Sequence, residues 1–297
     1  MPVLFGEVAC LGAALLWAVA VVLFRQPIAA WGARAINLLK CLLATALLLL
    51  TAIVFGGLQD LAVARPGHLA LLALSGLVGL TLGDTALFAA VARIGAHRTL
   101  LVQTLAPVFA GLLAVTLGER LSGVQLAGAA VVLAGVALVV GLDGGGSAPE
   151  RAAVARGLGL AVLAAFGQGI GVVIAKEGMA AVPVLPATLV RLAAASVGLL
   201  LVAAISSGFA PLRGALRDGV TLRRAVPAAF LGTYVAMLLM MGGVALAPAT
   251  MAAVLLSTSP IFSLVVEAVI DGRRPSTVAI VGTLVAVFGV AVLTIGG

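Results

Sequence analysis

The stretch Thr104-Leu105-Ala106-Pro107-Val108-Phe109 returns 153 residues later as Ser257-Thr258-Ser259-Pro260-Ile261-Phe262. In both copies polar residues precede a proline inside an apolar run, and a charged turn follows. The two turns read Gly118-Glu119-Arg120-Leu121-Ser122 and Asp271-Gly272-Arg273-Arg274-Pro275-Ser276. Glycines then stand at matching places in a second apolar run, namely Gly128 with Gly135 and Gly282 with Gly289. A period this long in an apolar chain indicates a duplicated membrane domain rather than a solenoid of short units.

The composition supports the same conclusion. Of the 297 residues, 63% are hydrophobic and 9% are charged, which excludes a soluble globular protein. The net charge of +7 falls mostly in loops between apolar runs, so it predicts attraction to anionic membrane lipids and no nucleic-acid surface. Both cysteines, Cys10 and Cys41, fall within apolar runs, so we expect no disulfide framework.

Ten runs are long enough to cross a bilayer, since a crossing helix needs about 20 apolar residues. The predicted spans are Phe5–Phe24, Ala33–Phe55, His68–Ala92, Ala96–Leu117, Ser122–Leu142, Ala155–Ala175, Pro186–Ile205, Ala225–Ala247, Ala249–Ile270 and Ser276–Ile295. A linker rich in glycine, within residues 143–154, separates a first domain at 1–142 from a second at 155–297.

Each half therefore has five spans. Because five is odd, the second half enters the membrane from the opposite face, which predicts an all-α membrane protein made of two inverted repeats. Inverted repeats are typical of carriers that work by alternating access, with a substrate site near the middle of the membrane. The prolines Pro107 and Pro260 each free a backbone carbonyl within a span, so we expect hinges there.

The pattern resembles the drug/metabolite transporter superfamily, in particular the ten-helix proteins with two EamA-type repeats. The resemblance rests on the Trp17 region, the string Pro107-Val108-Phe109…Gly118-Glu119-Arg120-Leu121-Ser122…Gln125…Gly128 and its weaker copy from Pro260 to Gly282. The copy departs from the pattern where Arg273 falls opposite Glu119. YddG-type amino-acid exporters are among the similar proteins, so the resemblance implies secondary transport, and export, across the inner membrane of a bacterium.

Two charged residues lie deep within predicted spans. Lys40 is roughly 10 Å inside its span at the helical rise per residue, and Asp84 lies at a similar depth from the same membrane face. A charge within the membrane is costly and normally faces a cavity or a partner. We therefore expect Lys40 and Asp84 to approach each other or to share one cavity. The alternatives are a purely structural ion pair and a lysine that snorkels to the surface.

The second half does not repeat this pair. Arg191 occupies the position of Lys40, while Met237 occupies that of Asp84. A zwitterionic amino acid would suit the combined site, with its carboxylate near Lys40 or Arg191 and its ammonium group near Asp84. Trp17 and Gln168 occupy corresponding positions at mid-span and are further candidates for the cavity wall. The remaining polar candidates for substrate binding are Gln103, Tyr234 and Ser257.

Other assignments are open at this stage. If transport is coupled to protons, Asp84 is a better candidate than Glu267 for the group that binds the proton, because Glu267 belongs to a charged cluster near an interface.

Most arginines lie in loops on one side, and the positive-inside rule puts that side in the cytoplasm and both termini outside. Many relatives are thought to have their termini inside. A monomer and a homodimer are both compatible with the sequence.

The sequence also disfavours other classes of protein. No Gly-x-x-x-x-Gly-Lys-Ser/Thr string occurs, so we expect no ATP hydrolysis. No set of His, Cys and carboxylate residues converges at one depth, so we expect neither an enzyme nor a cofactor or metal. An efflux carrier for drugs or quaternary cations is the closest alternative, and a membrane-embedded enzyme or a channel would be alternatives of another class.

Overall fold

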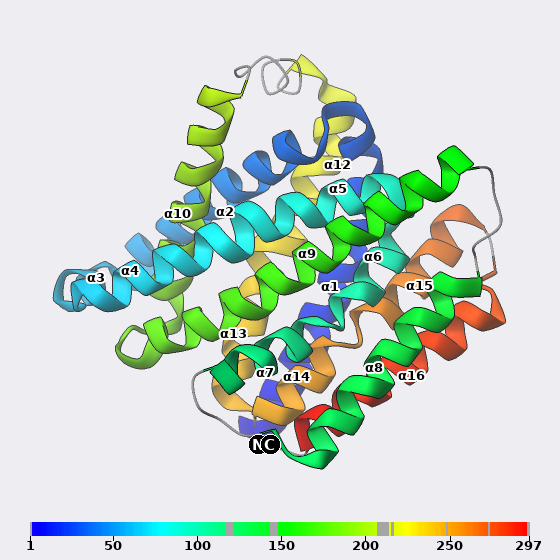
Figure 1. The fold of residues 1–297 in the computed structure, drawn as a ribbon. Helices are drawn as coiled ribbons and strands as arrows, with labels where there is room; N and C mark the ends of the chain where they lie inside the picture. Colours follow the sequence, from blue (N-terminus) through cyan, green and yellow to red (C-terminus); the bar gives the residue numbers. More distant parts are fainter. Residues whose placement is uncertain are drawn as a thin grey trace.

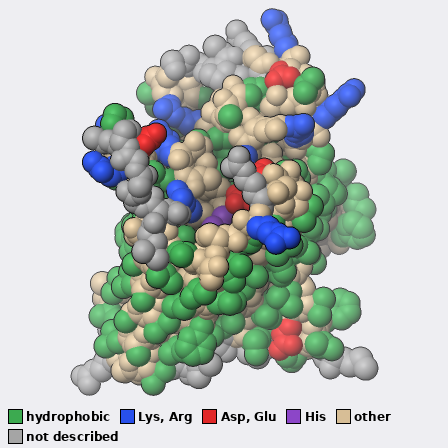
Figure 2. Space-filling model, turned by 90° about the vertical axis from the view of Figure 1, so that its right-hand side faces the viewer, with side chains coloured by type: hydrophobic (Ala, Val, Ile, Leu, Met, Phe, Trp, Pro, Cys, Tyr) green, Lys and Arg blue, Asp and Glu red, His purple; other side chains and the backbone are tan. Residues whose placement is uncertain are grey.

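The computed structural model describes residues 2–116, 121–142, 148–206, 214, 217–247, 249–272 and 274–295, and these contain helices and no strand. Several features of the sequence lie outside the described residues: the core of the charged turn at Gly118-Glu119-Arg120, residues 143–147 of the linker and Arg273. Within the described parts, nine helical stretches are long and apolar enough to cross a membrane. Figure 2 shows hydrophobic side chains over the lower part of one face, with Lys and Arg gathered above them.

The helices follow the order of the two repeats (Figure 1). The first half contains α1 (Pro2–Trp31), α2 (Ala33–Phe55), α3 (Leu58–Val63), α4 (Pro66–Ser75), the π-helix η1 (Gly76–Gly83), α5 (Asp84–Ile94), α6 (Ala96–Gln103), α7 (Ala106–Thr116) and α8 (Gly123–Leu142). The second half contains α9 (Ala148–Gly178), the short 3₁₀ turn η2 (Met179–Ala181), α10 (Val184–Ile205), α12 (Gly219–Ala229), the π-helix η3 (Phe230–Val235), α13 (Ala236–Leu246), α14 (Ala249–Leu256), α15 (Ser259–Asp271) and α16 (Thr277–Ile295).

Two boundaries differ from the sequence prediction. The first span was predicted to end at Phe24, but helix α1 continues through Pro27 to Trp31, because Ile28 beyond the proline packs into the core. Helix α9 begins at Ala148, inside the segment expected to be linker, and so starts before Ala155.

The two spans that carry the repeated motif are each broken into two helices, where one continuous helix was predicted. The chain leaves α6 at Thr104 and enters α7 at Ala106, and it leaves α14 at Leu256 and enters α15 at Ser259. The Thr104 hydroxyl donates to the Leu101 carbonyl at 2.6 Å, and Thr258 donates to Leu255 at the same distance. Each hydroxyl thus bonds to the same carbonyl as the backbone N–H of its own residue and closes the last turn of the first half-helix.

Helices α8 and α16 hold corresponding positions in the two repeats and pack directly on each other (Figure 1). A Cβ added to Gly128 would lie 2.3 Å from the Leu293 nitrogen, and one added to Gly135 would lie 2.5 Å from the Ala286 nitrogen. Because the residue number rises on α8 while it falls on α16, the two helices are antiparallel. Corresponding helices that run in opposite directions are what an inverted repeat requires, so this prediction is confirmed.

The first helix of each repeat packs against helices of the other repeat. Helix α1 of the first half packs on α12 and α13 of the second, while α9 of the second half packs on α4, η1 and α5 of the first. The end of α1, the turn between α5 and α6, the end of α10 and the start of α12 lie at one end of the molecule, which we call the arginine face (Figure 1). Both termini lie at the other end (Figure 1).

Candidate functional site

The centre of the site is an ion pair between Lys40 of α2 and Asp84 at the start of α5. The Lys40 Nζ contacts the Asp84 Oδ2, and both side chains are only 1% exposed. The expected approach of these two residues is therefore found. Helix α2 is apolar around Lys40, so the lysine has no route to the surface and pairs within the protein instead.

Neighbouring helices complete the surroundings of the pair. Gln168 of α9 donates its amide to the other carboxylate oxygen, Asp84 Oδ1, at 2.6 Å. The Lys40 ammonium lies 5.8 Å from the centre of the Trp17 ring and 5.4 Å from that of Phe88. Aromatic faces at this distance attract a cation. Four helical stretches from both repeats thus supply the groups that hold one lysine and one carboxylate.

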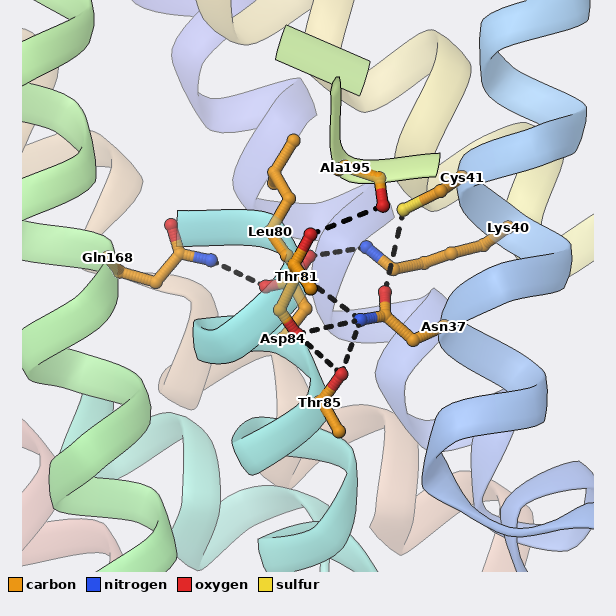
Figure 3. A network of polar contacts seen from close by, with 9 residues as sticks. All are labelled: Asn37, Lys40, Cys41, Leu80, Thr81, Asp84, Thr85, Gln168 and Ala195. Atoms are coloured by element: carbon orange, nitrogen blue, oxygen red, sulfur yellow. Dashed lines mark hydrogen bonds and ion pairs between the residues drawn. The ribbon is translucent and has the colours of Figure 1, made fainter. Parts of the chain in front are cut away.

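Asn37 extends the network by one turn of α2 (Figure 3). Its amide donates to the Leu80 carbonyl at 2.9 Å and to the Thr85 hydroxyl at 2.8 Å, and its oxygen accepts from Cys41. Leu80 belongs to the π-helix η1, whose wider turn directly precedes Asp84. The sequence prediction did not include Asn37, although an amide one turn before Lys40 within an apolar run was a usable signal. The structure buries this side chain fully.

Arg191, the residue that corresponds to Lys40, is 2% exposed. Among the described residues its Nε and Nη1 atoms have no hydrogen-bond partner. Its backbone carbonyl lies so close to η1 that a Cβ on Gly76 would be 2.1 Å from it, and its Nη2 faces Gly79. A buried guanidinium with free donors is a ready site for a carboxylate, which it can bind through two parallel bonds.

The other predicted site residues lie apart from this network. The Tyr234 hydroxyl is 2.6 Å from that of Thr51, and Ser257 donates to its own helix at Ala253. The side-chain nitrogen of Gln103, at the end of α6, is buried and without a partner in the described structure. Pro107 and Pro260 lie in the first turns of α7 and α15, next to the two breaks. Their roles as binding residues and hinges stay predictions.

A second cluster of polar groups joins the repeats at the arginine face. Arg25 of α1 bonds to Asp271 of α15 at 2.8 Å and lies 3.8 Å from Glu267. Glu267 also accepts from the backbone of His97, the second residue of α6, at 3.2 Å. This cluster ties α1 and α6 to the half-helix α15. In the described residues, no group of three His, Cys, Asp or Glu side chains could hold a metal ion.

Comparisons with known proteins fit this architecture. The sequence profile of the EamA-like transporter family matches residues 4–141 and again residues 155–295. One solved structure, described as "Crystal structure of protein", shares the fold with a TM-score of 0.69 and 20% identity, over 98% of this chain and 96% of that chain. No curated protein sequence matches the chain.

Proposed function

The chain belongs to the EamA-like transporter family, a group of membrane transporters within the drug/metabolite transporter superfamily, and from this premise we propose that it exports amino acids or similar small metabolites. The observation that carries the proposal is the buried Lys40–Asp84 pair together with Arg191, whose Nε and Nη1 have no partner in the described part of the chain. In this proposal the protein is a secondary carrier of a bacterial inner membrane and works by alternating access.

The charges of a zwitterionic amino acid match those of the site. The substrate ammonium would replace Lys40 at Asp84, whose second oxygen stays bonded to Gln168. The substrate carboxylate would bind the free donors of Arg191, or the ammonium of Lys40 once it is released. When the carboxylate binds Lys40, the exchange replaces one set of charge-assisted bonds with another, and neither Lys40 nor Asp84 is left without a counter-charge. The closed pair would then be the state between two transport steps.

Efflux of a quaternary cation is the second candidate, because two rings already flank the cation of Lys40. Trp17 and Phe88 could bind a substrate cation in its place, with Asp84 as the counter-charge. This function would leave Arg191 without a part in binding. The two candidates therefore differ in whether Arg191 matters.

The test is solute counterflow in proteoliposomes with an amino acid, its methyl ester and a quaternary amine. We expect saturable exchange of the free amino acid and weak exchange of the ester. Arg191→Gln should reduce amino-acid exchange by roughly tenfold or more, since a buried charge-assisted bond is lost. Arg223→Gln, an exposed arginine in α12, serves as the matched control and should leave exchange unchanged.

Equal exchange of acid and ester would contradict the amino-acid proposal. Exchange of the quaternary amine alone, unaffected by Arg191→Gln, would favour the efflux candidate. A conductance that rises linearly with concentration would contradict a carrier and favour a channel.

A further inference from the structure

A lateral groove of about 250 Å³ opens between α5, α9 and α10. Its described lining contains no acidic residue and consists of Arg34, Thr81, Leu82, Thr85, Ala86, Ala89, Leu160, Leu163, Leu199 and Val202. Leu82, Leu163 and Val202 are 62%, 52% and 38% exposed, so the groove opens sideways towards the hydrocarbon of the membrane.

Thr81 and Thr85, the polar residues on the inner wall of the groove, already have hydrogen-bond partners within the protein. The Thr81 hydroxyl donates to the Ala195 carbonyl at 3.2 Å, and the Thr85 hydroxyl accepts from Asn37. Their hydrogen-bonding capacity is thus used within the protein, and the rest of the wall is aliphatic. An apolar chain fits such a wall, whereas a polar solute would lose its hydration without gaining partners.

The end of the groove at the arginine face is basic. Arg34, in the first turn of α2, lines the groove itself. Arg93 lies one turn beyond Ala89 and donates to the Ala89 carbonyl at 2.7 Å, which holds its guanidinium group at the wall. Arg156 lies one turn before Leu160 on α9, next to Gly157, whose added Cβ would contact Arg93. All three arginines are exposed, and each comes from a different helix.

At the corresponding place in the other half, the described side chains differ in shape and in charge. Tyr234 stands where Thr81 does, and its hydroxyl lies 2.6 Å from that of Thr51, which stands where Val202 does. This contact bridges the two walls. The positions of Arg34, Arg93 and Arg156 are taken there by Leu185, Leu246 and Phe5. The side chains and the charges thus differ between the two corresponding places, which points to a ligand bound on one side alone.

We propose that this groove binds an anionic phospholipid of the surrounding membrane. Its phosphate lies among Arg34, Arg93 and Arg156, and one acyl chain lies along Leu160, Leu163 and Leu199. Arginine clusters at the membrane interface attract anionic headgroups, and the groove provides the apolar slot directly beneath them. The lipid contacts the wall that carries Thr85, the residue next to Asp84, and so supports the helix that holds the central ion pair. The inference does not depend on which solute the protein transports.

Native mass spectrometry of the full protein from nanodiscs with equal amounts of phosphatidylglycerol and phosphatidylcholine tests the proposal. We expect one retained phosphatidylglycerol. The variant Arg34→Gln/Arg93→Gln/Arg156→Gln should retain it at least roughly tenfold less. The matched control removes the same charge at the same face through Arg217→Gln/Arg223→Gln/Arg224→Gln, and should retain the lipid.

A third variant separates the headgroup from the chain. Val202→Trp fills the groove, leaves the arginines in place and changes a side chain that is already partly exposed. It should reduce retention of the long-chain lipid severalfold. The proposal is overturned if both lipids are retained equally, if the control triple variant loses as much lipid as the test variant, or if Val202→Trp has no effect. Displacement of the bound lipid by soluble glycerol phosphate would also overturn it, because the ligand would then be a free phosphate anion.

Discussion

A lysine and an aspartate that are both buried in a membrane protein depend on each other. Moving either charge out of water is expensive, and each is tolerated because the other compensates for it. Replacing Lys40 or Asp84 alone with methionine leaves an uncompensated charge, so each single variant should be destabilised by about 3–5 kcal/mol. The double variant Lys40→Met/Asp84→Met should be more stable than either single variant. Thermal unfolding in detergent measures the three effects.

Transport assays on the same variants separate a binding role from a structural one. If the pair binds substrate, the double variant loses counterflow although its stability recovers. Recovery of both stability and counterflow in the double variant would show that the pair is structural. Methionine is a mild replacement at this site, since Met237 occupies the position of Asp84 in the second repeat.

Asp218, outside the membrane-spanning segments, is another carboxylate whose charged form is stabilised by its neighbours. Its carboxylate caps α12 and accepts from the hydroxyl and the backbone N–H of Thr221, and these bonds lower the pKa of Asp218 below its usual value of 3.8. A lowered pKa in the folded state gives stability that is complete above the unfolded value and is lost as pH falls through the folded value. We therefore expect the wild type to lose slightly more stability than Asp218→Asn between about pH 6 and pH 3. Parallel melting curves for both proteins would contradict this expectation.

At the scale of elements, both repeats contain a π-helix at the same place. η1 (Gly76–Gly83) precedes Asp84, and η3 (Phe230–Val235) ends just before Ala236. A π-helix leaves some carbonyl groups poorly placed for ordinary helical bonds, and the Asn37 amide satisfies one of them at Leu80. Such segments occur frequently at functional sites. Here the widened turn aims Asp84 at α2.

The glycines of η1 allow a matched test of this packing. A Cβ on Gly76 would lie 2.1 Å from the Arg191 carbonyl oxygen, and this backbone atom cannot move aside cheaply. A Cβ on Gly79 would meet its nearest atom at 3.7 Å, which is ordinary contact. Gly76→Ala should therefore lower the unfolding free energy by about 1–3 kcal/mol, and Gly79→Ala by much less. Equal effects in thermal unfolding would contradict the close packing of η1 on α10.

Some of these elements could be predicted and others could not. Hydropathy and the repeated proline motif predict the spans and the inverted arrangement, because both depend on simple periodic patterns. The similar depths of Lys40 and Asp84 within their spans were enough to predict that the two side chains approach each other. The π-helices have no comparable signature in the sequence, so the turn that orients Asp84 was missed. Proline predicted a hinge in each motif, but the complete break also depends on the hydroxyls of Thr104 and Thr258 bonding to their own helices.

The whole molecule combines a symmetric scaffold with asymmetric chemistry. Close packing is preserved between the halves, as in the pairs Gly135 with Ala286 and Val132 with Gly289. The charges are not preserved: the acidic residue of the central pair occurs in the first half alone. The groove near Arg34, Arg93 and Arg156 is lined by both halves, and the positions that correspond to these arginines hold Leu185, Leu246 and Phe5. In the proposed alternating-access mechanism, the duplicated halves rock against each other, and the side chains that differ between them form one site. The positive-inside rule puts the arginine face in the cytoplasm, and this orientation stays a prediction.

Movement of the halves requires the contacts of Arg25 with Asp271 and Glu267 to open at the arginine face. Ser263, fully buried behind these contacts and 3.4 Å from the His97 ring, reports on that opening. We replace Cys10 and Cys41 with alanine, introduce Ser263→Cys, and measure its labelling by a membrane-impermeant thiol reagent. Adding Asp271→Asn should speed labelling about fivefold, since a partly exposed ion pair contributes about 1 kcal/mol.

The matched control is Asp218→Asn, which removes an acidic group at the same face that bonds to Trp31 at the end of α1 and forms no ion pair with Arg25 in the described structure. It should leave the labelling rate unchanged, because Asp218 caps α12 and takes no part in the ion pairs that join Arg25 to α15. Substrate that closes this face should slow labelling in the Ser263→Cys protein and should slow it less when Asp271→Asn is present. If both acidic replacements speed labelling equally, general loosening of the face is the cause, and the ion pair between the repeats is not a gate.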